Sequence, residues 1–106
     1  MKLIDLISYF RSGEDYESFC KEQALSAESE AIEIYGRKPL YLDSPLGFFP
    51  IEETGGLIEF QWEGVPYQNL FDFFYFLEVI EDAKGNDKLG NTELAQILLT
   101  YALNDA

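Results

Sequence analysis

The longest apolar pattern in the chain covers residues 70–80, where large aliphatic and aromatic side chains are interrupted by only two acids. This run is too short to span a bilayer, which takes roughly 20 apolar residues. At helical spacing it predicts a helix that is apolar around most of its circumference and therefore buried. Asn69 is the expected N-cap, and Gly85 is expected to end the helix. The core candidates on this helix are Leu70, Phe73, Phe74, Leu77 and Ile80.

Two helices are predicted near the N-terminus. Apolar residues recur at helical spacing over residues 2–11, and Gly13 follows as a helix stop. Acidic residues then suit the start of a second helix, because the helix dipole favours negative charge there. The apolar face of this second helix carries Tyr16, Phe19 and Cys20.

Residues 27–35 fit two interpretations. Ala27, Ala31 and Ile34 share one face of a helix that Ser26 would cap, whereas residues 32–34 alternate as they would in a strand. We expect a helix here and keep the strand as the alternative.

The middle of the chain is rich in proline, glycine and β-forming residues. Residues 48–51 predict a short strand that Pro50 confines to a sheet edge. Residues 57–63 alternate, which places Ile58, Phe60 and Trp62 on a buried face. A turn then leads into an edge strand at residues 65–67. The expected fold is a single α+β domain over residues 1–106, in which helices at both ends of the chain pack on a small three-stranded antiparallel meander.

The polar segment 82–93 has the length of a calcium-binding loop. However, Lys84 stands at the third position and Asp87 at the sixth, where a ligand and a glycine are needed. We therefore interpret it as a connection to a last helix that Asn91 caps. The expected buried face of that helix comprises Leu94, Ile97, Leu98 and Tyr101.

Charge is the strongest indication of function. The chain has 20 acids and 7 bases, a formal net charge of −13, and no lysine or arginine over residues 39–83. This balance argues against binding of DNA, RNA or an anionic membrane, because those ligands need a basic surface. It favours a basic protein partner or a cation.

The residue types for common catalysis are missing. Without histidine the chain lacks nucleophile–histidine pairs and the usual neutral-pH base. The single Cys20 excludes an internal disulfide, suits a reducing cytoplasm and is expected in the core. No glycine-rich phosphate loop occurs, and the N-terminus does not fit a secretory signal. We therefore expect a cytoplasmic protein that is not an enzyme and has no cofactor or metal site.

The base-free segment contains two groups of candidate binding residues. One group lies on the polar face of the strand at 57–63 and just before it, and the other lies at the end of the aromatic helix. Tyr41 and Tyr67 are possible interface anchors, whereas strand parity assigns Trp62 to the core. The candidate partner-binding residues are Glu52, Glu53, Glu59, Gln61, Glu63, Tyr67, Glu78, Glu81 and Asp82.

Four segments give the chain a family resemblance. They are residues 1–10 (MKLIDLISYF), 16–20 (YESFC), 31–35 (AIEIY) and 101–106 (YALNDA). In these segments and in its acidity the chain resembles the small immunity proteins of contact-dependent growth inhibition systems. The resemblance implies a protein that binds and neutralises a cognate toxin domain, often a nuclease, and it transfers no functional residue.

Two other functions fit the composition. A nucleic-acid mimic that blocks a host DNA-binding enzyme uses the same charge and would space its carboxylates like phosphates. A small enzyme that relies on paired carboxylates is the third possibility.

Overall fold

Four antiparallel strands and five helices make up residues 1–105, the part of the chain that the computed structural model describes. The strands are β1 (Ile32–Arg37), β2 (Leu46–Pro50), β3 (Glu59–Trp62) and β4 (Val65–Asp72), in the sheet order β2-β1-β4-β3. The helices are α1 (Leu3–Arg11), α2 (Tyr16–Glu22), α3 (Ile51–Thr54), α4 (Phe73–Ala83) and α5 (Asn91–Asp105). This arrangement confirms the α+β class. Ala106, the last residue of the segments that carry the resemblance, lies outside the described residues.

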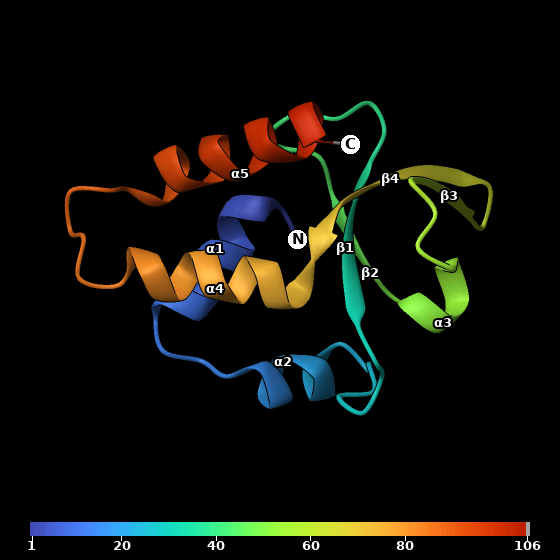
Figure 1. The fold of residues 1–106 in the computed structure, drawn as a ribbon, viewed down its shortest axis with the longest axis horizontal. Helices are drawn as coiled ribbons and strands as arrows, with labels where there is room; N and C mark the ends of the chain where they lie inside the picture. Colours follow the sequence, from blue (N-terminus) through green and yellow to red (C-terminus); the bar gives the residue numbers. More distant parts are fainter. Residues whose placement is uncertain (106) are drawn as a thin grey trace.

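The helices lie on two sides of the sheet. Figure 1 shows α1, α2, α4 and α5 on one side, and α3 with the β3–β4 hairpin on the other. We call the side that carries α3 the outer face. The main core lies between the sheet and the four longer helices, and aromatic rings fill its centre. Ring centroids of Phe73 lie 5.6 Å from Phe10, 5.3 Å from Phe19 and 5.7 Å from Phe76.

The first two helices follow the sequence pattern. In α1 the buried residues are Leu3, Leu6, Ile7 and Phe10. In α2 the carboxylate of Asp15 accepts a hydrogen bond of 2.7 Å from the Ser18 amide, which caps the helix and lowers the pKa of Asp15. Phe19 and Cys20 are buried, so the predicted core position of Cys20 is confirmed.

The expected helix at residues 27–35 is wrong, and the strand alternative is correct. Strand β1 lies between β2 and β4, and the side chains of Ile32 and Ile34 point from it into the main core. A helix would have placed Ile34 on one face with Ala27 and Ala31 but Ile32 off that face, whereas the strand buries both isoleucines completely.

The three-stranded meander is also incorrect. Strand β2 is an edge strand, as predicted, but it ends at Pro50 and pairs with β1, where the sequence pattern favoured a helix. β3 and β4 form the expected hairpin, yet β4 is eight residues long and is an inner strand.

The aromatic run is divided between two elements. Leu70 and Phe71 belong to β4, and α4 begins at Phe73. The N-cap is Asp72, whose Oδ1 accepts a hydrogen bond of 2.8 Å from the Tyr75 amide. Asn69, the expected cap, instead donates from its side chain to Glu33 over 2.8 Å.

The shift in helix start changes which residues are buried. Of the five core candidates, Leu70, Phe73 and Ile80 are buried, whereas Leu77 is half-buried and Phe74 is 49 % exposed. Phe76 is completely buried although it was not among the candidates. In α5 the buried face turns similarly, toward Leu94, Ala95, Leu98 and Ala102, and leaves Ile97 and Tyr101 exposed.

Arg11 joins α1 to the connection between α4 and α5. Its guanidinium donates to the Leu89 carbonyl over 2.7 Å and to Oδ1 of Asn91 over 2.9 Å. It also donates to the carbonyls of Ala83 and Asn86, each over 3.4 Å. One side chain thereby binds the end of α4, the loop and the start of α5.

We expect Arg11→Met to lower the free energy of unfolding by about 1.5–3 kcal/mol. The substitution removes hydrogen bonds from a charged donor and leaves the carbonyls that accepted them without this donor. Urea unfolding measures the change. Lys21→Met is the control, because it removes one positive charge from an exposed side chain with no hydrogen bond or ion pair among the described residues. Equal unfolding midpoints for the two variants would contradict the structural role of Arg11.

Candidate partner-binding site

The outer face of the sheet carries a second group of packed aromatic rings. Phe49 lies at its centre, with ring centroids 5.6 Å from Tyr35, 5.2 Å from Phe60, 5.8 Å from Trp62 and 5.5 Å from Tyr67. Strands β1, β2, β3 and β4 all contribute a ring. The group therefore holds the hairpin against the rest of the sheet.

Polar contacts fix α3 and the segment after it over part of this face. The carboxylate of Glu33 accepts hydrogen bonds from the Thr54 hydroxyl, 3.3 Å, and from the Asn69 side chain, 2.8 Å. The Tyr35 hydroxyl donates to the Leu57 carbonyl over 2.5 Å. Burial raises the pKa of this tyrosine. Helix α3 and the segment after it bury Tyr35 and Thr54 but do not extend over Trp62, which is 46 % exposed.

A groove of about 440 Å³ runs beside these rings. One wall is the edge strand β2 with the rings of Trp62 and Tyr67, and another is the turn at residues 23–26. The groove lining includes Ala24, Gly47, Phe49, Glu53, Trp62 and Tyr67. A Cβ atom added to Gly47 would lie 2.7 Å from Phe49 and 3.0 Å from Tyr67, so the two rings pack where this strand position has no side chain.

The turn that forms the second wall is conformationally fixed. The Leu25 amide donates to the Cys20 carbonyl over 2.7 Å, and the Ala24 amide donates to the Lys21 carbonyl over 3.3 Å. This is the hydrogen-bond pattern of a Schellman motif, in which the left-handed position usually holds glycine. Here Ala24 occupies it with φ 56°.

The candidate residues from the sequence separate into two regions. Glu53 and Tyr67 line the groove. Glu52, Glu59, Gln61 and Glu63 lie on α3 and the hairpin, on the same side of the molecule. Glu78, Glu81 and Asp82 lie on the last turns of α4, which runs away from the sheet toward the opposite end of the molecule (Figure 1). The two acidic groups therefore do not form one surface.

The structure also distinguishes the carboxylates by their contacts. Glu52 accepts hydrogen bonds from the Ser29 hydroxyl and the Glu30 amide, and the first of these contributes most to lowering its pKa. Glu59 pairs with Lys38, and Glu81 pairs with Lys84 over 2.9 Å. Among the described residues no such partner occurs for the carboxylates of Glu53, Glu63, Glu78 and Asp82. These four side chains are free to meet an external cation.

Sequence reasoning misplaced Trp62. The alternating pattern correctly predicts that Trp62 lies on the same face of the strand as Phe60, but it does not show whether that face is covered. β3 is a four-residue edge strand, and the cover on the outer face does not reach its end. Ile58 is likewise exposed rather than buried. Tyr41, the other possible anchor, is exposed in the connection between β1 and β2.

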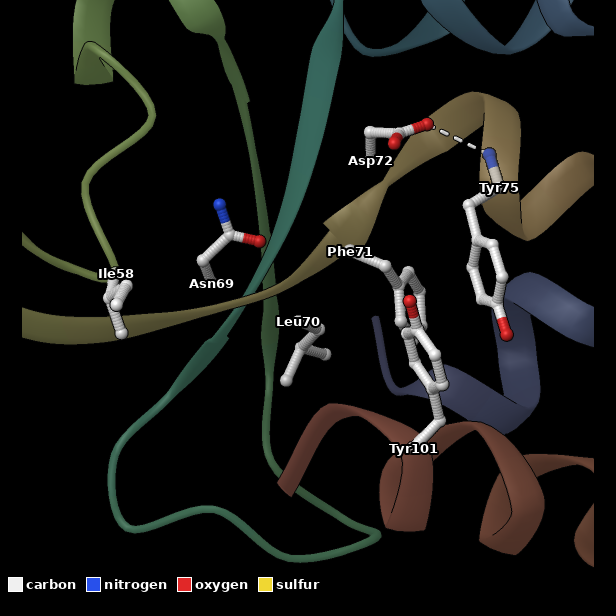
Figure 2. A pocket seen from close by; sticks show the side chains of 7 residues that line it. All are labelled: Ile58, Asn69, Leu70, Phe71, Asp72, Tyr75 and Tyr101. Carbon is white, nitrogen blue, oxygen red and sulfur yellow. Dashed lines mark hydrogen bonds between the residues drawn. The ribbon is translucent and has the colours of Figure 1, made fainter. Parts of the chain in front are cut away.

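A second hollow, of about 260 Å³, lies where β4 meets α4 and α5 (Figure 2). Its lining is Ile58, Asn69, Leu70, Phe71, Asp72, Tyr75 and Tyr101. The Tyr75 and Tyr101 rings stack with centroids 4.5 Å apart, and Asp72 is engaged in the cap of α4. None of the candidate partner-binding residues lines this hollow.

Reactive groups are placed in the interior. Burial raises the pKa of the Cys20 thiol, which keeps it protonated, and also raises that of the neighbouring Tyr16 phenol. Within residues 1–105, no three histidine, cysteine or acidic side chains lie close enough together to hold a metal ion. No helix in this part of the chain has the length and apolarity needed to cross a membrane.

Comparison with protein-family models, with curated proteins and with solved structures finds no match to this chain.

The tip of the β3–β4 hairpin gives a first test of that geometry. Glu63 and Gly64 have φ of 52° and 78°, as in a type I′ turn, where asparagine is strongly preferred at the first position. We expect Glu63→Asn to raise the free energy of unfolding by about 0.5–1 kcal/mol, because asparagine tolerates the left-handed conformation better than glutamate.

Thermal and urea unfolding check this expectation. Gln61→Asn is the control, because it introduces the same residue at a regular strand position, where asparagine is disfavoured. Destabilisation by Glu63→Asn would show that the glutamate is held at the tip by interactions within the chain.

Proposed function

We propose that this chain is a cytoplasmic immunity protein that binds and neutralises a cognate toxin domain, a basic nuclease. The observation that carries the proposal is the arrangement on the outer face, where an exposed tryptophan lies beside carboxylates without internal partners. Trp62 supplies the exposed ring, the half-buried Tyr67 lies beside it, and Glu53 supplies the carboxylate in the same groove. Aromatic anchors with a polar rim are the usual composition of protein–protein interfaces.

The charge explains why such a partner would be basic. A nuclease must present lysine and arginine to phosphates, so an inhibitor that presents carboxylates meets a complementary field. Complementary fields raise association rates by roughly 10–10³-fold, which matters for a toxin that must be captured before it acts. The function proposed here is therefore rapid binding and needs no catalytic group on this chain.

The arrangement of acids favours this function over nucleic-acid mimicry. A mimic would present carboxylates at regular spacing along a continuous surface. Here Glu52, Glu59 and Glu81 are engaged within the chain, and the two acidic groups lie at opposite ends of the molecule. An exposed tryptophan in the same groove as a carboxylate suits a protein partner better.

Co-expression with a candidate toxin tests the proposal. The candidate is the C-terminal domain encoded by the open reading frame immediately upstream of this chain's gene. We expect the chain to restore growth of cells that express this domain and to form a stable complex with it in size-exclusion chromatography. Continued growth arrest without complex formation would refute the proposal for this pair. Competition with DNA for a host DNA-binding enzyme would instead support the mimic.

Paired charge reversals then identify the binding region. Glu53→Lys with Glu63→Lys should slow association with the toxin domain by about tenfold or more, because both carboxylates face the proposed partner. Glu78→Lys with Asp82→Lys changes the net charge equally but at the far end of α4, and should slow association less. Stopped-flow rates at low and high salt measure both effects.

Two results would contradict this assignment. A larger effect of the α4 pair would move the interface to the far end of the molecule. Association rates that do not change with ionic strength would remove the electrostatic part of the proposal, because attraction between exposed charges is screened by salt.

A further inference from the structure

The groove beside Trp62 has the features of a receptor for a single cationic side chain. Resting on the function proposed above, we infer that it binds the guanidinium of an arginine carried by the partner protein. The inference concerns the chemistry of the ligand that this groove accepts. It can be tested without the toxin.

The aromatic wall suits a cation. Trp62 packs against Phe49, 5.8 Å between ring centroids, and still exposes 46 % of its surface. Tyr67 packs against the same phenylalanine at 5.5 Å. Rings held in this way lose little conformational freedom on binding, and tryptophan is the best of the aromatic side chains at attracting a cation through its face.

The charges around the groove indicate the same ligand. Glu53 lines it and has no hydrogen bond or ion pair from its carboxylate among the described residues. No lysine or arginine side chain lines the groove. The backbone of Met1 accepts a hydrogen bond from Leu46, at the start of β2, whereas Glu53 follows the end of that strand. The N-terminal ammonium of Met1, the one positive charge on the described lining residues, therefore lies toward the other end of the groove from Glu53.

Arginine fits these features better than lysine. Its planar guanidinium stacks on an aromatic ring and can bind a carboxylate through its edge at the same time. Both kinds of surface, a tryptophan ring and a carboxylate without an internal partner, are among the residues that line the groove. The turn at residues 23–26, fixed by the Schellman hydrogen bonds, also lines the groove.

Trp62 is the only tryptophan of the chain, so its fluorescence reports on this groove directly. The probe is an N-acetylated, C-amidated pentapeptide with a central arginine between alanines. The matched control peptide replaces arginine with citrulline, which keeps the shape and removes the charge. We expect a saturable change of Trp62 emission with the arginine peptide, with a dissociation constant of about 0.1–1 mM.

Variants of the chain separate the two contributions. Glu53→Gln should weaken binding of the arginine peptide about tenfold and leave binding of the citrulline peptide unchanged. Glu17→Gln removes an exposed carboxylate on α2 that does not line the groove, and should leave both titrations unchanged. Circular dichroism of each variant checks that the fold is intact, so that a loss of binding is not a loss of structure.

The inference is overturned if citrulline binds as tightly as arginine, if no saturable change occurs, or if folded Glu53→Gln binds like the parent. Its failure is distinguishable from that of the proposed function. Arginine-specific binding without protection from the toxin would remove the inhibitor and keep the cation site. Protection without arginine-specific binding would keep the inhibitor and show that its partner binds elsewhere.

Discussion

At Asp72 the chain changes from strand β4 to helix α4, and this change joins the sheet to the helical layer. The Asp72 carboxylate accepts a hydrogen bond from the Tyr75 amide and so fixes where the helix begins. Phe71 consequently remains in the sheet opposite Ile34. Phe73 enters the core, where its ring packs against Phe10 of α1 and Phe19 of α2. A helix that began earlier would remove residues from β4 and leave β1 with a shorter partner. The aromatic run thus contributes side chains to both the sheet and the helical layer, because the cap at Asp72 ends the strand and begins the helix within it.

The two faces of the sheet have different roles as a result. Four helices pack on one face and form the main core with it, so most of its side chains serve stability. On the outer face Glu33 fixes Thr54 and Asn69, and α3 covers only part of the rings. The exposed Trp62 therefore sits on a rigid frame, a combination that favours binding because little order has to be gained.

Helices α1, α2 and α5 and the β3–β4 hairpin could be predicted because their signals are local: apolar spacing, caps and turn residues. The errors arose where tertiary pairing outweighed local pattern. The apolar pattern of residues 32–34 fits both the helical and the strand periodicity. The strand forms because it pairs with β2 and β4 on its two sides, which the local pattern does not reveal. Likewise, the pattern at residues 57–63 gives the parity of Trp62 correctly, but parity does not reveal whether another layer covers that face. Acidic candidates were identifiable by composition, whereas their internal partners, such as Lys38 for Glu59, depend on the fold.

Net charge by itself therefore says little about where this protein binds. Self-repulsion among acids costs stability, and ion pairs within the chain reduce that cost. Glu59 forms an ion pair with Lys38 and Glu52 accepts hydrogen bonds from Ser29 and Glu30, whereas Glu53 and Glu63 have neither, although they occupy the same side of the molecule. Glu63 in addition holds a left-handed backbone conformation that asparagine would adopt more easily. The unpaired carboxylates of Glu53 and Glu63, together with the exposed ring of Trp62, are the features that the proposed basic partner would complement.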